Sequence, residues 1–166
     1  MNPARREIYK AWIAAGLWLL LIGIESTDWL SAGNTGRILY PIFHWLTGVD
    51  AFTFMFWNFY IRKTGHVVGY FLLSWLLFRA WRATIPAVHA LPWSLQWARI
   101  AFFMTALVAC LDEWHQTFLP SRTGSLHDVL LDSTAAFAAQ LLIFAWFYFR
   151  GSNVAGPIQG RSTAQG

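Results

Sequence analysis

The sequence is short of charge and nearly without cysteine, and each shortage excludes a class of protein. Only 12% of its 166 residues are charged, about half the share found in an average soluble domain. So few charges could not cover the surface of an ordinary water-soluble domain of this size. The single cysteine, Cys110, cannot form an intrachain disulfide, which excludes a disulfide-stapled scaffold.

What the sequence has in quantity is apolar and aromatic residues. Hydrophobic residues make up 57% of the chain and aromatic residues 18%, and the mean hydropathy is +0.42. This composition excludes disorder of the whole chain. The basic residues lie in short groups beside apolar runs and form no stripe of their own, so we expect no nucleic-acid partner. The composition therefore predicts a small polytopic membrane protein that contacts membrane lipids.

Four apolar runs bounded by charges predict four membrane helices. The first run follows Arg5, Arg6 and Lys10 and so resembles a signal peptide, but no clean cleavage site follows it and we favour an uncleaved helix. With basic and aromatic ends placed at the headgroups, the predicted helices cover 8–26, 60–81, 93–114 and 128–149. The predicted fold is an all-α polytopic membrane four-helix bundle, a single domain over residues 1–166, with a flexible tail at 151–166.

The long first connection is not expected to be a free loop. The segments 38–46 and 51–57 are too apolar for a solvated linker and too interrupted to span a bilayer. We therefore predict a partly helical interfacial or re-entrant segment between the first two membrane helices.

The distribution of basic residues predicts the orientation. If the N-terminus is cytoplasmic, eight basic residues lie inside (Arg5, Arg6, Lys10, Arg79, Arg82, Arg99, Arg150 and Arg161) and four lie outside (Arg37, Arg62, Lys63 and Arg122). Because basic residues favour the cytoplasmic side, we expect both termini in the cytoplasm.

Polar and ionisable residues gather at the ends of three predicted helices on the same side of the membrane. Lys63, His66 and Tyr70 share one helical face through their i, i+3 and i+7 spacing. Ionisable groups at this depth are costly unless they are paired or functional. The candidate binding residues are Lys63, His66, Tyr70, Asp112, Glu113, Gln116, Arg122, Asp128 and Asp132, and the candidate catalytic residues are His66, Asp112 and Glu113.

Several of these residues also have structural interpretations. Asp128 follows Ser125 in a helix-capping pattern, and Lys63 suits a headgroup anchor. Histidines 115 and 127 suit exposed interfacial positions, and no pair of histidines has a recognised zinc spacing. We therefore predict no metal and no cofactor. Gly65-x-x-x-Gly69 and the alanine run 135–139 predict close helix packing.

The polar residues form two motifs that resemble the VanZ-like family of bacterial membrane proteins. The first is Arg62-Lys63-Thr-Gly-His66-x-x-x-Tyr70, and the second is Asp112-Glu113-x-His-Gln116-x-Phe-x-Pro-x-Arg122-x-Gly-Ser-x-x-Asp128-Val-Leu-Leu-Asp132. The resemblance implies a protein of the bacterial inner (cytoplasmic) membrane and a link to glycopeptide (teicoplanin) resistance, from which the family takes its name. It implies no particular reaction. One departure is Ala135-Ala136, where the family pattern leads us to expect a glycine.

Three functions remain open at this point. The first is a binding or regulatory envelope protein whose outward-facing polar pocket takes a lipid-linked or anionic ligand, such as an envelope precursor, or another membrane protein. The second is a membrane enzyme that uses His66, Asp112 and Glu113 in acid-base chemistry on a lipid-linked substrate. A transporter ranks third, because four short helices leave little room for a site at the membrane midplane. Lys63 and Arg122 could hold a phosphate in the first two cases, so composition does not separate them.

Overall fold

The structure is helical in every regular element that it describes. The computed structural model describes residues 2–85 and 93–152, and the all-α prediction is confirmed over these ranges. The elements in chain order are α1 (Pro3–Glu25), the short 3-10 helix η1 (Asp28–Leu30), α2 (Ala32–Thr47), α3 (Ala51–Thr84), α4 (Leu95–Gln116) and α5 (Leu126–Ser152).

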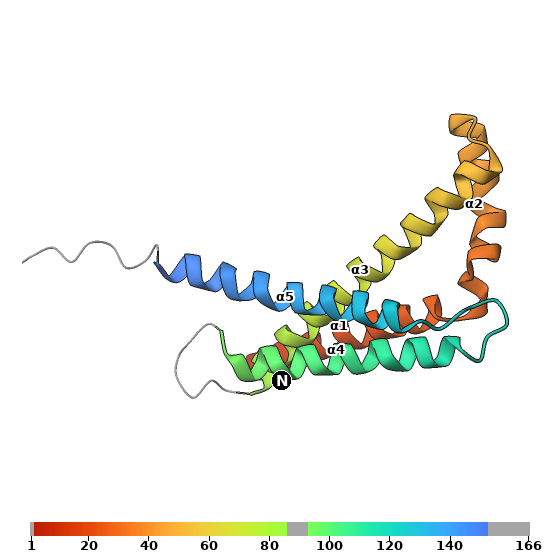
Figure 1. Ribbon diagram of the computed structural model, residues 1–166. Helices are drawn as coiled ribbons and strands as arrows, with labels where there is room; N and C mark the ends of the chain where they lie inside the picture. Colours follow the sequence, from red (N-terminus) through yellow and green to blue (C-terminus); the bar gives the residue numbers. More distant parts are fainter. Residues whose placement is uncertain (1, 86–92, 153–166) are drawn as a thin grey trace, which may run out of the picture.

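The long helix α3 organises the molecule, because α1, α4 and α5 all pack against it (Figure 1). We call the end where α1 and α4 stop and α5 begins the polar end. The end where α1 and α4 begin and α3 stops is the aromatic end. The Trp12 indole N–H donates to the Thr84 hydroxyl across the aromatic end, at 2.9 Å. Both ends of the bundle are therefore built from several helices at once.

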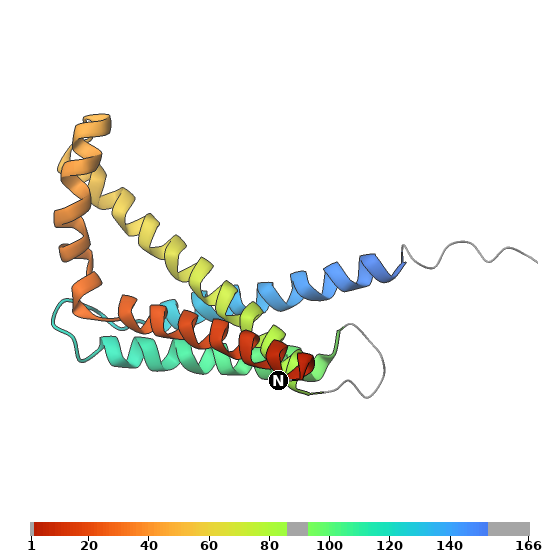
Figure 2. The same cartoon turned by 180° about the vertical axis from the view of Figure 1, so that it is seen from behind.

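Helix α2 and the first half of α3 form a hairpin that stands away from the bundle at the polar end (Figure 2). Gly48 ends α2 with a positive φ of 71°, a conformation that glycine adopts without strain. Asp50 then caps α3 by accepting from the backbone N–H groups of Phe52 and Thr53. Because of this cap, α3 begins at Ala51, nine residues before the start of the predicted helix at residue 60. The first connection therefore contains more helix than predicted.

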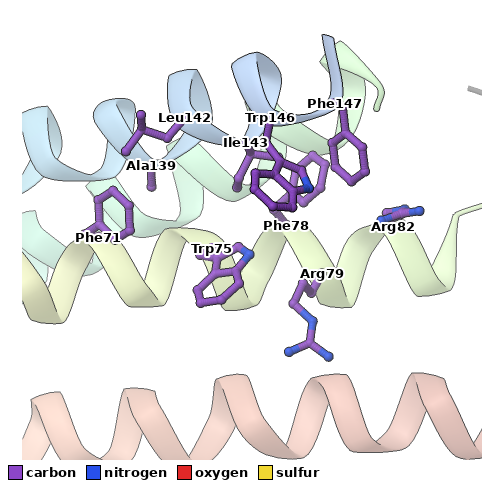
Figure 3. A pocket seen from close by; sticks show the side chains of 10 residues that line it. All are labelled: Phe71, Trp75, Phe78, Arg79, Arg82, Ala139, Leu142, Ile143, Trp146 and Phe147. Carbon is purple, nitrogen blue, oxygen red and sulfur yellow. The ribbon is translucent and has the colours of Figure 1, made fainter. Parts of the chain in front are cut away.

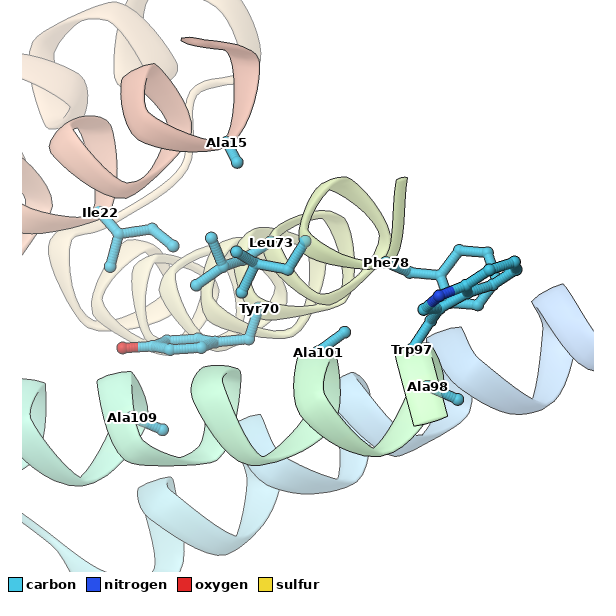
Figure 4. Close-up of a cluster of buried hydrophobic side chains, with 10 residues drawn as sticks. Ala15, Ile22, Tyr70, Leu73, Phe78, Trp97, Ala98, Ala101 and Ala109 are labelled. Carbon is cyan, nitrogen blue, oxygen red and sulfur yellow. The ribbon is translucent and has the colours of Figure 1, made fainter. Parts of the chain in front are cut away.

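The bundle buries small residues at its helix contacts and exposes large ones. Ala101, Ala109, Ala136 and Ala139 are buried between helices, whereas Leu17 on α1 is 63% exposed. This is the arrangement expected in lipid, where small residues let helices approach and large apolar side chains face the acyl chains. The core cluster also contains Ile22, Tyr70, Leu73, Phe78 and Trp97 (Figure 4).

Three helices are long and apolar enough to cross a membrane: α1, α4 and α5, the last from Leu126 to Arg150. The chain is therefore a membrane protein by the length and composition of these helices. Helix α3 does not meet the same criterion, because Arg62 and Lys63 precede its apolar stretch and Arg79 and Arg82 follow closely. The described residues thus form five α-helices, whereas the prediction was four membrane helices and a partly helical segment between the first two.

Two smaller predictions need correction. Gly65 is exposed, and a Cβ built on either Gly65 or Gly69 would meet nothing within 4 Å, so neither position needs glycine for a close helix approach. Gly69 is nevertheless buried at a helix contact, where its carbonyl accepts from the Trp18 indole N–H of α1 at 2.8 Å. The alanine run does pack as predicted, and the Ser74 hydroxyl donates to the carbonyl of Ala136 at 3.0 Å. Helix α5 continues to Ser152, so the predicted tail begins too early, and its remainder lies outside the described residues.

Candidate functional site

The polar face of α3 pairs with acids of α4 and α5 at the polar end. Lys63 forms an ion pair with Asp128, His66 Nδ1 lies 3.3 Å from Asp132 Oδ2, and the Tyr70 hydroxyl donates to Asp112 Oδ2 at 2.8 Å. The three residues that share one face of α3 therefore each contact a different acid. Each pair joins α3 to a different turn of a neighbouring helix.

The His66–Asp132 pair lies deepest on α5. Asp132 is fully buried, and its second carboxylate oxygen, Oδ1, has no hydrogen-bond partner among the described residues. A carboxylate so placed is costly in a membrane unless something compensates its charge. Among the predicted site residues, Asp132 is therefore the one whose burial is hardest to explain by a purely structural role.

Glu113 and the loop after α4 depend on one another. The backbone N–H of Ser125 donates to Glu113 Oε2 at 2.8 Å. The approach is close because residue 124 is glycine: a Cβ there would lie 2.2 Å from the carbonyl oxygen of Glu113 and 2.5 Å from Thr117 Cγ2. Glu113 itself is only 4% exposed. The turn thus holds a buried carboxylate in place through backbone atoms.

Arg122 fastens the same loop to the end of α1. Its Nη2 donates to the carbonyl oxygens of Glu25 and Thr27, at 2.6 and 2.9 Å. Burial lowers the pKa of Arg122 from its ordinary value, while the carboxylates of Asp112, Asp28 and Glu113 act in the opposite direction. Arg122 therefore carries its charge among acids without a direct ion pair to any of them in the described residues.

Two cavities open beside these pairs. The larger has a volume of about 230 Å³, and Arg62, His66 and Arg122 line it together with Glu25 and Asn58. The smaller, of about 10 Å³, is roughly the size of one water molecule and is lined by His66, Tyr70 and Asp112 among others. His66 and Glu25 line both cavities.

Buried polar atoms without partners concentrate at the polar end. Among the described residues they include Asp112 Oδ1, Gln116 Nε2, Arg122 Nε and Asp132 Oδ1. Buried polar atoms are rarely left unpaired in folded proteins, and such exceptions need a reason. Arg122 and Asp112 themselves line the two cavities, so their unpartnered atoms are candidates for contacts with a ligand or with water.

Some of the purely structural roles predicted for individual residues are confirmed and others are not. The Ser125 hydroxyl caps α5 by accepting from His127 N at 3.2 Å, while the Asp128 carboxylate turns to Lys63 instead. Histidines 115 and 127 are exposed, as expected, although His115 Nδ1 lies 3.1 Å from the Ser26 hydroxyl. Gln116 is buried beside the acids.

Sequence reasoning missed the role of Arg62. It was treated as a charge that sets topology, yet its Nη1 donates to the carbonyl of Leu30 at 2.6 Å and its side chain lines the larger polar cavity. The contact joins two segments far apart in sequence. No local pattern signals it, because the partner is a backbone carbonyl.

The aromatic half of the bundle also has a groove, between α3 and α5, with a volume of about 500 Å³. Trp75, Phe78, Trp146 and Phe147 line it, with Arg79 and Arg82 at its edge (Figure 3). The Arg82 guanidinium lies 4.9 Å from the centre of the Phe147 ring. Within the described ranges 2–85 and 93–152, the residues that line this groove include no carboxylate and no histidine, in contrast to the polar end.

Comparison with known proteins gives one match. The family model described as VanZ/LLP1 matches residues 11–148, which include the polar residues of α3, α4 and α5 described above. No curated protein and no solved structure matches the chain.

Proposed function

The chain belongs to the VanZ/LLP1 family, and from that premise we propose that its polar end is an outward-facing pocket for the anionic headgroup of a lipid-linked ligand. The protein then resides in the bacterial inner membrane with both termini in the cytoplasm. The second half of α3 serves as the fourth membrane span, and α2 lies along the outer surface. The ligand is a lipid-linked envelope precursor, whose sequestration would connect the protein to glycopeptide (teicoplanin) resistance.

The observation that carries the proposal is the lining of the larger polar cavity. Arg62 and Arg122 come from different elements and reach the same space of about 230 Å³, which is also lined by His66, itself in contact with the buried Asp132. Two guanidinium groups near one another repel, and the one carboxylate of the same lining, Glu25, offsets only one of their two charges, which leaves a positive charge for a bound anion. Arginine is also the side chain that best matches the planar geometry of phosphate and carboxylate oxygens.

The two arginines keep donors free for a ligand. A guanidinium has five N–H donors, and the hydrogen bonds to the carbonyls of Leu30, Glu25 and Thr27 use only Arg62 Nη1 and Arg122 Nη2. Those bonds hold the side chains in place before a ligand arrives. Arg122 Nε is buried with no partner among the described residues, so an anion would satisfy it.

Binding to a polyprenyl phosphate tests the proposal directly, with the matching neutral polyprenol as the comparison ligand. We expect the phosphate to bind the full chain in nanodiscs and the polyprenol to bind at least tenfold more weakly, as measured by native mass spectrometry. Arg62→Gln and Arg122→Gln should each weaken phosphate binding about tenfold, the effect of losing about 1.4 kcal/mol. Arg99→Gln, which removes an exposed arginine at the aromatic end, is the matched control and should bind normally.

Equal binding of the phosphate and the polyprenol would contradict the proposal. So would normal phosphate binding by both the Arg62 and Arg122 variants. Because Arg122 also holds the loop against α1, its variant is compared with Arg122→Lys, and each protein is checked for a normal melting temperature before binding is measured.

The orientation is tested by labelling from either side of the membrane. Cys110 is first replaced by alanine, and single cysteines are then placed at Ser121, in the loop at the polar end, and at Gln96, at the aromatic end. A charged maleimide added to intact cells should label position 121 and spare position 96. Labelling of position 96 alone would invert the topology and move the pocket to the cytoplasmic side.

A second candidate is an enzyme acting on the same class of ligand, and the His66–Asp132 pair favours it. Asp132 holds the imidazole through Nδ1 at 3.3 Å, which leaves Nε2 as the nitrogen able to accept or give a proton. This is the way a carboxylate orients a catalytic histidine. Release of inorganic phosphate from a polyprenyl diphosphate, lost in His66→Gln while ligand binding persists, would select the enzyme. Binding without release would select the first proposal.

A further inference from the structure

We propose that the polar end also binds a divalent transition-metal ion, held by His66 of α3, Glu113 of α4 and Asp132 of α5. The site goes beyond the anion pocket formed by Arg62 and Arg122, although His66 borders both. It also departs from the sequence-based prediction of no metal, which relied on spacing along the chain. The three residues belong to three helices, so no sequence spacing could reveal them.

The ligand atoms of these residues are already close together. One nitrogen of His66 and one oxygen each of Glu113 and Asp132 all lie within 4.8 Å of one another. The 3.3 Å between His66 Nδ1 and Asp132 Oδ2 is longer than the ordinary 2.7–2.9 Å of a charged hydrogen bond, by about 0.5 Å. For this one pair the separation matches the edge of a tetrahedron whose centre lies about 2.0 Å from each ligand, roughly 3.3 Å, while the three ligand atoms together lie within 4.8 Å.

The buried acids at this end of the bundle form a favourable environment for a cation. Asp112, Glu113 and Asp132 are each at least nine-tenths buried. Lys63 is engaged with Asp128, and the Arg122 Nη2 group donates to backbone carbonyls, which leaves His66 as the basic group in direct contact with the buried acids. One imidazole cannot balance three carboxylates. A divalent ion at their centre would do so, because it compensates charge where water is excluded.

Independent support comes from the atoms left without partners. Asp132 is fully buried and its Oδ1 accepts no hydrogen bond in the described residues, and Asp112 Oδ1 is in the same condition. Asp112 also lines the cavity of about 10 Å³ that adjoins His66. That space is about the size of one water molecule, and a water is the fourth ligand expected at a metal site with three protein ligands; of the three proposed ligands, His66 lines this space.

The surroundings of the ligands resemble those of known metal sites. Ligating carboxylates are themselves usually held by hydrogen bonds, and the Ser125 N–H holds Glu113 Oε2 at 2.8 Å. The donor set of one imidazole nitrogen and two carboxylate oxygens suits Zn²⁺ or Mn²⁺ better than Mg²⁺ or Ca²⁺, which prefer oxygen alone. Zn²⁺ is therefore the first ion to test.

Metal content and metal-dependent stability test the site without any ligand or activity. Untagged full-length protein in detergent, stripped with a chelator and then dialysed against Zn²⁺, should retain about one equivalent per chain by mass spectrometry of the metal, and its melting temperature should rise. Asp132→Asn, Glu113→Gln and His66→Gln should each lower the retained zinc at least tenfold and abolish the rise. His127→Gln, the matched change at an exposed histidine of the same end, should behave like the parent.

The stripped proteins separate loss of the site from loss of the fold. Each variant should melt close to the stripped parent, since Asn and Gln keep the size of the groups they replace. A variant that fails this check is replaced by His66→Cys on a Cys110→Ala background and loaded with Co²⁺. Coordination by residue 66 then produces a thiolate-to-cobalt absorption band that a cysteine elsewhere, such as His127→Cys, does not give.

Three outcomes would overturn the proposal. The stripped parent could take up no zinc and show no change in melting temperature, the His66 and Asp132 variants could retain zinc as well as the parent, or the His66→Cys protein could lack the band. None of these results bears on binding of polyprenyl phosphate by Arg62 and Arg122, so the metal site and the anion pocket can fail separately.

Discussion

The same helices pack in opposite ways at the two ends of the bundle. At the polar end, α3 meets its neighbours through Lys63, His66 and Tyr70, each paired with a buried or half-buried acid. At the aromatic end, rings pack against rings: Trp12 meets Trp81 with centroids 5.2 Å apart, and Phe78 meets Trp97 at 6.0 Å. Ring packing stabilises the bundle without burying charge.

The ends also differ in how completely their polar groups are satisfied. At the aromatic end the indole N–H groups of Trp12 and Trp97 donate to Thr84 and to the carbonyl of Ile85, leaving Trp93 Nε1 as the buried atom without a partner in the described part of that end. At the polar end acids, amides and a guanidinium all keep unpartnered buried atoms. Stability alone would favour the aromatic arrangement at both ends. The polar end is therefore the stronger candidate for a functional site.

The largest expected effect comes from closing the gap at Gly124. A methyl group there would lie 2.2 Å from the Glu113 carbonyl oxygen, so Gly124→Ala must push the loop away from α4. We expect a loss of about 1–3 kcal/mol, seen as a lower melting temperature in detergent. The matched control is Gly65→Ala, where the added methyl meets nothing within 4 Å and improves helix propensity by up to about 1 kcal/mol. Equal melting of the two variants would show that the loop does not depend on this close approach.

The next largest effect concerns the Lys63–Asp128 pair. The side chains are 31% and 22% exposed, so removing one partner strands a partly buried charge. We expect Lys63→Gln to cost about 1–3 kcal/mol of unfolding free energy, and addition of Asp128→Asn to restore part of it. The measurement is thermal unfolding of the two single variants and the double variant, read as a cycle.

The control for this cycle lies at the aromatic end. Lys10 and Glu7 also form an ion pair, at 2.8 Å, but their side chains are 55% and 65% exposed. The cycle of Lys10→Gln with Glu7→Gln should show no measurable coupling. Equal coupling energies in the two cycles would contradict the claim that the ion pair at the polar end contributes more to stability than the exposed pair at the aromatic end.

The contrast between the ends also explains how far the sequence could predict them. Helical spacing within α3 placed Lys63, His66 and Tyr70 on one face, because three residues on one helix are related by geometry alone. Which acid meets which base depends on how α4 and α5 rotate against α3. The sequence offers Arg122 as a group that could hold a phosphate, whereas the structure also uses its Nη2 to hold backbone carbonyls of the α1 end. Contacts to backbone carbonyls leave no pattern in a sequence.

The length of α3 escaped prediction for a related reason. The charges at Arg62 and Lys63 predict the start of a membrane helix, because charge patterns mark the membrane boundary. A helix continues past that boundary when its backbone is capped further out. Asp50 supplies the cap, so the helix and the apolar stretch within it begin at different residues.

A moderate effect is expected from the aromatic end itself. Trp12→Phe keeps an aromatic ring against Trp81 but removes the hydrogen bond from Trp12 Nε1 to the Thr84 hydroxyl. We expect a loss of about 1 kcal/mol, with zinc content and polyprenyl phosphate binding unchanged. Trp29→Phe is the matched control, because Trp29 is 85% exposed and should melt normally. Loss of ligand binding in the Trp12 variant would mean that the two ends are coupled.

The smallest effect should come from Asp50, which lies outside the bundle at the start of α3. Hydrogen bonds from the Thr53 hydroxyl, and from the backbone N–H groups of Thr53 and Phe52, hold the pKa of Asp50 below its ordinary value of 3.8. A lowered folded-state pKa means that the cap stabilises the helix above pH 3.8 and is lost as the pH falls through the folded-state value.

Because Asp50 is exposed and caps only the hairpin with α2, its loss should fray the first turn of α3 and leave the bundle intact. Hydrogen exchange at neutral pH should therefore be faster at residues 51–54 in Asp50→Ala, with unchanged melting temperature. Asp28→Ala, which alters an acid of η1 and not the α3 cap, should leave that exchange unchanged. A fall in the melting temperature of Asp50→Ala would show that the hairpin supports the polar end more strongly than its separation from the bundle suggests.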